Sequence, residues 1–238
     1  AYNVASKSIV LLKNEQEVLP INTEKVKKIA VIGLNATAPT AAGGMGAGVK
    51  TPYEITPLQG LQNRLGDKVE IVYAQAYKHY MGIFGAYMPN QSDIAQTIDE
   101  APDAALLTEA VAAARNADLV LFFAGTNKFI ESESIDRKDI TLPVSQNAIL
   151  SKIAEVNPNI VTVIVSGGPC DLREVDQKSN AIVQAWWNGS EGGHALADVL
   201  LGNISPSGKL PFTFPLQLED SPAYALGVFP GGDADKED

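Results

Sequence analysis

Residues 119–137 read LVLFFAGTNKFIESESIDR, and this stretch decides how the rest of the chain is interpreted. Its first part, Leu119 to Ala124, is an unbroken apolar run, which is typical of a parallel strand buried on both faces. Two carboxylates, Glu131 and Glu133, follow a few residues later. Open α/β sheets bind ligands at the carboxyl ends of their strands, and carboxylates placed there can act as general acids or bases. The stretch predicts a central strand followed by an exposed loop over 128–138, and a solvated acidic loop without chemistry is the alternative.

Strands and helices alternate along the rest of the chain. Apolar runs predict further strands at 26–33, 69–74, 160–165, 181–187 and 210–214. Residue spacing predicts helices at 57–65, 104–116, 144–156 and 190–202. A short N-terminal helix is expected to run into a strand. The irregular pattern at 77–102 predicts a long loop or lid. Thr56 is the expected N-cap of the first of these helices and Ser190 that of the last. This alternation predicts an α/β fold, with a mainly parallel sheet covered by helices on both faces.

The composition is that of a globular protein with a sizeable core. Of the 238 residues, 45% are hydrophobic and 19% are charged, which argues against a disordered chain. The formal charge of −10, without a basic cluster, disfavours a nucleic-acid partner, and no apolar run approaches the roughly 18 residues of a membrane span. The single cysteine, Cys170, excludes an internal disulfide and is expected to be a buried structural thiol. His79 and His194 are far apart in sequence and do not have the spacing of a pair of metal ligands, so we expect no metal. We also expect no cofactor.

A glycine-rich segment, with Gly43, Gly44 and Gly46, follows the predicted strand at 26–33. It begins about ten residues after that strand and does not lead into a helix, so it lacks the context of a dinucleotide-binding loop. We interpret it as a flexible loop whose glycines meet a conformational need, and a nucleotide-binding protein is disfavoured.

Two adjacent aromatic residues, Trp186 and Trp187, close the predicted strand at 181–187. Aromatic faces can stack on sugar rings, but an aromatic side chain at the end of an apolar strand more commonly packs into the core. Core packing of at least one ring is therefore the preferred interpretation.

Several motifs together resemble the second domain of the family 3 glycoside hydrolases, the β-glucosidase and β-xylosidase group. Residues 131–137 resemble the E-x-E-G-x-D-R segment of that family, with Ser134 in place of its usual glycine. Further matches follow in the family's order: SIVLLKNE at 8–15, LP at 19–20, IAVIG at 29–33, QAWW at 184–187, EGG at 191–193 and PSGKLPFTFP at 206–215. The resemblance implies an α/β sandwich with a six-stranded sheet in which one strand is antiparallel.

The resemblance also implies a chemistry. It is that of a retaining β-glycosidase acting on terminal non-reducing β-D-sugars, so that a β-linked oligosaccharide or glucoside is the expected substrate. Glu133 aligns with the family's general acid/base, and Glu131 is the alternative. Asp136 and Arg137 are expected to form a loop-fixing ion pair rather than to contact the substrate. The glycine-rich loop would border the entrance of the active site.

A partner domain is the last implication of the resemblance. In this family the nucleophilic Asp lies on a preceding N-terminal (β/α)₈ barrel, so we expect this chain to be a fragment that is nearly inert alone. We divide it into an interdomain segment at 1–25, an α/β sandwich at 26–218 and a polar C-terminal tail at 219–238. A periplasmic or extracellular location is favoured over a cytoplasmic one. Because Ser134 departs from the family pattern, a non-catalytic carbohydrate-binding or interaction module stays open, and the upstream sequence would decide between the two.

Overall fold

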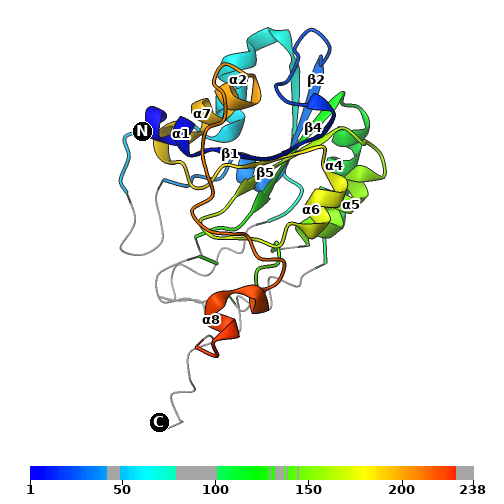
Figure 1. Ribbon diagram of the computed structural model, residues 1–238. Helices are drawn as coiled ribbons and strands as arrows, with labels where there is room; N and C mark the ends of the chain where they lie inside the picture. The colour runs from blue at the N-terminus through cyan, green and yellow to red at the C-terminus, as the bar shows by residue number, and fades with distance from the viewer. Residues whose placement is uncertain are drawn as a thin grey trace.

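A six-stranded sheet forms the centre of the computed structural model, which describes residues 1–41, 49–78, 101–128, 130, 131, 137, 139–143 and 145–228 (Figure 1). The strands are β1 (Val10–Asn14), β2 (Lys28–Ile32), β3 (Glu70–Ala74), β4 (Leu119–Gly125), β5 (Ile160–Val165) and β6 (Ala181–Gln184). They lie in the order β1-β6-β5-β4-β2-β3. All neighbouring pairs are parallel except β1 and β6, which are antiparallel. The predicted fold class is confirmed.

Helices cover both faces of the sheet. On one side lie α1 (Tyr2–Ser8), α2 (Pro57–Leu65) and α7 (Gly192–Leu200), and on the other lie α4 (Ala104–Arg115), α5 (Gln146–Ala154) and α6 (Arg173–Lys178) (Figure 1). Short 3₁₀ turns occur at η1 (Glu15–Glu17), η2 (Leu34–Ala36), η4 (Gly66–Lys68), η5 (Gly189–Glu191) and η6 (Leu218–Asp220). Each helical layer packs on its own hydrophobic cluster, so the sheet is the shared wall of two cores.

Strand β4 occupies the interior of the sheet, between β2 and β5. All seven of its residues are buried. Leu121 and Phe123 belong to the cluster under α1, α2 and α7, whereas Val120 and Phe122 belong to the cluster under α4, α5 and α6. Alternate side chains thus fill both cores, which is why the sequence of this strand is apolar throughout. The prediction of a central strand at 119–124 is confirmed.

The sixth strand is β1, and the predicted strand at 210–214 is wrong. Residues 10–14, inside the predicted segment 1–25, pair with β6 at the edge of the sheet. The 210–214 region contains Pro211 and is followed by Pro215, and neither has a backbone N–H to contribute to a ladder. Phe212 and Phe214 instead place their rings edge-on against Trp186, with centroids 6.1 and 6.3 Å away.

The two predicted helix caps have different outcomes. Thr56 and Gln59 form a capping box at the start of α2, as expected from the Thr-Pro sequence. Ser190 does not cap α7, because η5 precedes that helix and Glu191 occupies the N-cap position. The backbone N–H of Gly193 donates instead to the Ile55 carbonyl at 3.0 Å, so the segment before α2 satisfies the first turn of α7.

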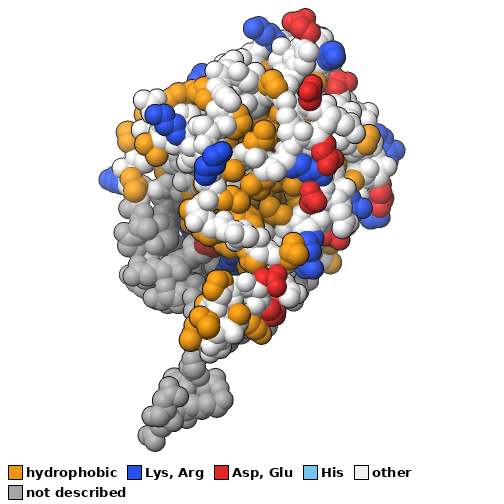
Figure 2. All heavy atoms as spheres, viewed as in Figure 1, with side chains coloured by type: hydrophobic (Ala, Val, Ile, Leu, Met, Phe, Trp, Pro, Cys, Tyr) orange, Lys and Arg blue, Asp and Glu red, His pale blue; other side chains and the backbone are white. Residues whose placement is uncertain are grey.

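After α7, the chain leaves the helical layers and runs along the molecule to α8 (Pro222–Ala225) (Figure 1, orange to red). Apolar side chains with substantial exposure gather on this stretch: Phe212, Leu216, Tyr224, Leu226 and Val228. Figure 2 shows apolar atoms around α8, with acidic side chains beside them. None of the helices in the described residues is long and apolar enough to cross a membrane.

A buried carboxylate on α7 ties three parts of the structure together. Asp198 accepts hydrogen bonds from the Arg64 guanidinium on α2 at 2.8 and 2.9 Å, and from the Tyr2 hydroxyl on α1. Asn203 Nδ2 donates to the same carboxylate at 2.9 Å. Burial pushes the pKa of Asp198 upward, but the hydrogen bonds from Arg64, Tyr2 and Asn203 outweigh it and lower that pKa to about 2.

We predict that Asp198→Asn lowers the free energy of unfolding by about 2 kcal/mol at neutral pH, because Arg64 loses its charged partner. The folded pKa of Asp198 lies below the ordinary value of 3.8. Its stabilising effect is therefore complete at neutral pH and is lost as the pH falls from about 5 to 2. Urea unfolding of both proteins at neutral pH and near pH 3 measures the two effects. An equally large acid-induced loss of stability in the variant would contradict this role.

Candidate functional site

Two of the sequence-predicted loops leave the sheet side by side. The chain passes from β2 outward to β3, and then returns to β4 on the other side of β2, so the winding direction reverses between β2 and β4. Such a switch point is where open α/β sheets bind ligands, outside the carboxyl ends of the strands. The segment after β2 contains the glycine-rich stretch, and the segment after β4 contains the acidic stretch. The fold therefore places the beginnings of both loops at one location.

Buried polar contacts fix the carboxyl end of β4. The Tyr77 hydroxyl donates to the Phe123 carbonyl at 2.8 Å, and Gln146 bonds both the N–H and the carbonyl of Gly125, at 2.8 and 2.9 Å. A Cβ atom at Gly125 would collide with the Val165 carbonyl of β5, and its φ of 134° is unfavourable for other residues. The acidic segment thus starts from a rigid point.

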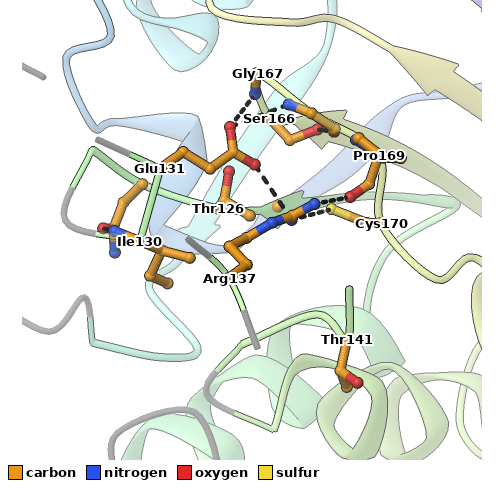
Figure 3. Close-up of polar contacts among 12 residues, drawn as sticks. Thr126, Ile130, Glu131, Arg137, Thr141, Ser166, Gly167, Pro169 and Cys170 are labelled. Atoms are coloured by element: carbon orange, nitrogen blue, oxygen red, sulfur yellow. Dashed lines mark hydrogen bonds and ion pairs between the residues drawn. The ribbon is translucent and has the colours of Figure 1, made fainter. Parts of the chain in front are cut away.

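Glu131 binds the turn that follows β5 (Figure 3). Its Oε2 atom accepts hydrogen bonds from the backbone N–H groups of Gly167, at 2.7 Å, and Gly168, at 3.0 Å. Its Oε1 atom lies 3.3 Å from Nη1 of Arg137. Only 14% of the Glu131 side chain and 15% of the Arg137 side chain are exposed. The carboxylate is therefore a buried, charge-compensated group between two segments of the chain.

Arg137 binds the same turn from the other end of the acidic stretch. Its Nη2 atom donates a short hydrogen bond to the Pro169 carbonyl, and its Nη1 atom lies 3.9 Å from the sulfur of Cys170 (Figure 3). Burial raises the pKa of the Cys170 thiol to about 11, so at neutral pH this group is not a thiolate nucleophile. The prediction of a buried structural cysteine is confirmed.

The prediction of an exposed loop over 128–138 is wrong for the residues that the structure describes. Ile130 is buried, and Glu131 and Arg137 are mostly buried, because their charges are compensated by each other and by backbone groups. The structure places the Glu131 carboxylate beside Arg137. Glu133 and Asp136 lie outside the described residues, as do Gly43, Gly44 and Gly46.

Sequence reasoning missed the partners of these loops. Gly167, Gly168 and Pro169 were not identified as partners, although a Gly-Gly-Pro run after a buried strand indicates a turn with accessible backbone groups. Glu54 was not identified at all. It accepts hydrogen bonds from the N–H groups of Thr40 and Ala41, at the beginning of the glycine-rich loop, with the Ala41 contact at 2.9 Å.

The tryptophan pair packs as the preferred interpretation expected. Both side chains are partly buried, and Trp187 contacts the hydrophobic cluster under α1, α2 and α7. Trp186 donates its indole N–H to the Ser8 carbonyl at 3.0 Å. Trp186 has a φ of 59°, which is not an extended conformation. Strand β6 ends at Gln184, earlier than the predicted residue 187.

Acidic, histidine and cysteine side chains do not gather into a potential metal site in the part of the chain that the structure describes. A small pocket lies beside the site, between the flanks of the glycine-rich loop and the start of α7. It is lined by Thr40, Glu54, Ile55, Pro57, Val165, Ala185, Trp186, Asn188, Gly189, Gly192, Gly193 and Leu196. Glu131 does not line this pocket.

Comparison with known proteins shows one family throughout. Residues 9–236 match the glycosyl hydrolase family 3 C-terminal domain. The chain is 40% identical over 240 residues to the beta-glucosidase BoGH3A of Bacteroides ovatus, covering 97% of this chain and 31% of that protein. It is 35% identical over 251 residues to an exo-alpha-(1->6)-L-arabinopyranosidase of Bifidobacterium longum, covering 97% of this chain and 30% of that protein.

A solved structure agrees with the sequence comparisons. The family 3 beta-glucosidase of Bifidobacterium adolescentis superposes with a TM-score of 0.80 at 32% identity, covering 98% of this chain and 30% of that chain. The chain thus spans less than a third of the length of these relatives. It belongs to glycoside hydrolase family 3, as a C-terminal domain of that family.

Proposed function

We propose that this chain is the acid/base-donating domain of a retaining β-glycosidase, and that Glu133 is the general acid/base. The observation that carries the proposal is the position of the acidic stretch, which leaves the interior strand β4 at the switch point of the sheet. A preceding (β/α)₈ barrel of the same protein would supply the nucleophilic Asp and most contacts to the terminal sugar. The coverage of less than a third of each relative supports such a partner domain.

The contacts of Glu131 support the choice of Glu133. Glu131 already accepts from two backbone N–H groups and faces Arg137. The Oε2 atom of Glu131 is occupied by these two donors and its Oε1 atom faces the guanidinium, so Glu131 cannot approach a leaving group without breaking these contacts. Glu133, two residues later, is the other carboxylate that matches the family motif. We therefore assign proton transfer to Glu133 and withdraw the alternative assignment to Glu131.

The proposed reaction has two steps. In the first, the Asp of the barrel attacks the anomeric carbon while Glu133 protonates the glycosidic oxygen, so the bond to the leaving group breaks and a covalent glycosyl-enzyme forms. In the second, Glu133, now ionised, removes a proton from water, whose oxygen attacks the anomeric carbon and releases the sugar. The glycine-rich loop with Gly43, Gly44 and Gly46 would border the entrance of this site.

The relatives set the range of substrates to test. One is a beta-glucosidase and another is an exo-alpha-(1->6)-L-arabinopyranosidase, so similarity at this level does not fix a single sugar. We propose a terminal β-D-glucoside as the first candidate, with xylosides and α-L-arabinopyranosides as comparison substrates. The specificity contacts would lie mainly on the partner barrel.

Retention of configuration is the result that tests this function. We expect the full-length protein that contains this domain to release the β-anomer of the sugar first from an aryl β-glucoside, because two successive displacements restore the original configuration. Proton NMR of the fresh product, followed before mutarotation, distinguishes the anomers. Initial release of the α-anomer would contradict a double-displacement mechanism.

A further inference from the structure

We propose that Glu131 and Arg137 form a clasp that positions Glu133, and that Glu131 acts in catalysis only through this positioning. The inference rests on the proposed function, since it assumes that Glu133 is the acid/base. Glu131 precedes Glu133 by two residues and Arg137 follows it by four. Both side chains bind the turn after β5, so one described residue on each side of Glu133 in the sequence is fixed to that turn.

The turn that receives the clasp is itself firmly held. The Ser166 hydroxyl donates to the Gly168 carbonyl at 2.8 Å. Gln184 of β6 donates from Nε2 to the Ser166 carbonyl at 3.2 Å and to its hydroxyl at 3.1 Å. Ser166, Gln184 and Cys170 are all buried. The clasp therefore connects the acidic stretch to a rigid edge of two neighbouring strands.

Each half of the clasp depends on the other. Glu131 and Arg137 are only 14% and 15% exposed, so the loss of one charge leaves the other buried without its ionic partner. In Figure 3 the carboxylate lies between the N–H groups of the turn and the guanidinium, and the guanidinium reaches on to the Pro169 carbonyl. Glu131→Gln keeps the size of the side chain but presents an amide in place of a carboxylate to Arg137.

Loss of the clasp should affect proton transfer selectively. A displacement of about 1 Å can cost on the order of 10²-fold in rate when a reacting group must be aligned. In the full-length protein, we expect Glu131→Gln to lower kcat/KM for an alkyl β-glucoside by about 10- to 100-fold. For 2,4-dinitrophenyl β-glucoside, whose leaving group needs no proton, kcat/KM should change less than about threefold. General unfolding would lower both values equally, and it is checked by comparing thermal unfolding with the assay temperature.

A second observable separates positioning from proton donation. Glu131→Gln should retain the alkaline limb of the pH profile for the alkyl glucoside, because Glu133 still titrates, whereas Glu133→Ala should lose that limb. In the Glu133→Ala background, adding Glu131→Gln should produce little further loss, because a residue that acts through Glu133 has nothing left to position. Asp139→Asn, a change at an exposed acid of the same segment, is the control and should behave like the unmodified protein.

A steric variant tests the clasp without changing a charge. A Cβ atom at Gly167 would lie 2.6 Å from Glu131 Oε2, so Gly167→Ala should displace the carboxylate. At Gly168 the nearest atoms are Arg137 Nη2 at 3.5 Å and Glu131 Oε1 at 3.7 Å, which is ordinary contact, so Gly168→Ala should have a much smaller effect. We expect Gly167→Ala to reproduce the leaving-group dependence of Glu131→Gln.

The outcomes separate this inference from the proposed function. If Glu133→Ala shows the leaving-group dependence but Glu131→Gln and Gly167→Ala do not, the clasp is wrong and the assignment of Glu133 stands. Fully additive effects of the two substitutions would also overturn the clasp, and so would loss of the alkaline limb in Glu131→Gln. If Glu133→Ala is as active as the unmodified protein on alkyl glucosides, the proposed function itself fails.

Discussion

Glu133→Ala in the full-length protein should lower kcat/KM for alkyl β-glucosides by about 10²–10⁴-fold, which is the usual contribution of general acid catalysis. An alkoxide is a poor leaving group and needs a proton as the glycosidic bond breaks. A 2,4-dinitrophenolate leaves without one, so the variant should still form the glycosyl-enzyme from the activated glucoside. A plot of log kcat/KM against the pKa of the leaving group should therefore be much steeper for the variant.

The control for this prediction is an acid of the same segment. Asp139 is exposed, and its carboxylate accepts a hydrogen bond from the Thr141 backbone at 2.8 Å. Asp139→Ala should leave the dependence on the leaving group unchanged. If the two variants have the same steepness, Glu133 is not the proton donor.

The second large effect concerns the isolated domain. We predict that the 238-residue chain alone turns over aryl β-glucosides at least about 10³-fold more slowly than the ordinary enzyme range of about 1–10³ s⁻¹. A retaining mechanism needs a nucleophile and an acid roughly 5–5.5 Å apart, and we assign the nucleophile to the partner barrel. The assay compares the purified chain with the full-length protein on the same substrate, after far-UV circular dichroism has shown that the chain is folded.

Turnover by the isolated chain within the ordinary range would contradict a nucleophile on another domain. A full-length protein without glycosidase activity would instead favour the non-catalytic carbohydrate-binding or interaction module that the sequence left open. Ser134, in place of the family's glycine, is the departure that raised this alternative.

The sheet could be predicted where one physical cause dominates. Strands β4 and β5 are buried on both faces, and apart from Thr162 in β5 their sequences carry no polar side chain. Thr56 and Gln59 interact within one helical turn, so the start of α2 could be predicted from neighbouring residues in the sequence. The strand predicted at 210–214 is wrong because the alternation of apolar residues was given more weight than Pro211 and Pro215, which lack ladder donors. The packing of the two Phe rings against Trp186 could not be predicted from the sequence.

The sequence predicted which side chains could carry the chemistry of the candidate site, but not which groups contact them. The acidic motif and its position after β4 follow from the sequence and the order of the strands. Glu131, however, bonds Gly167 and Gly168, which are 36 and 37 positions away and contribute only backbone N–H groups. Every residue except proline carries such a group, so the Gly-Gly-Pro run indicates a turn but does not indicate that its N–H groups bind Glu131. The structural role of Glu131 therefore became visible only with the turn in place.

Azide rescue of Glu133→Ala in the full-length protein tests the central claim most directly. The variant is incubated with 2,4-dinitrophenyl β-glucoside, with and without sodium azide, and the products are identified by NMR. We predict faster turnover with β-glucosyl azide as the product, because azide attacks the glycosyl-enzyme without needing a general base. A rate that does not respond to azide, with glucose as the sugar product, would contradict the assignment of the acid/base to Glu133.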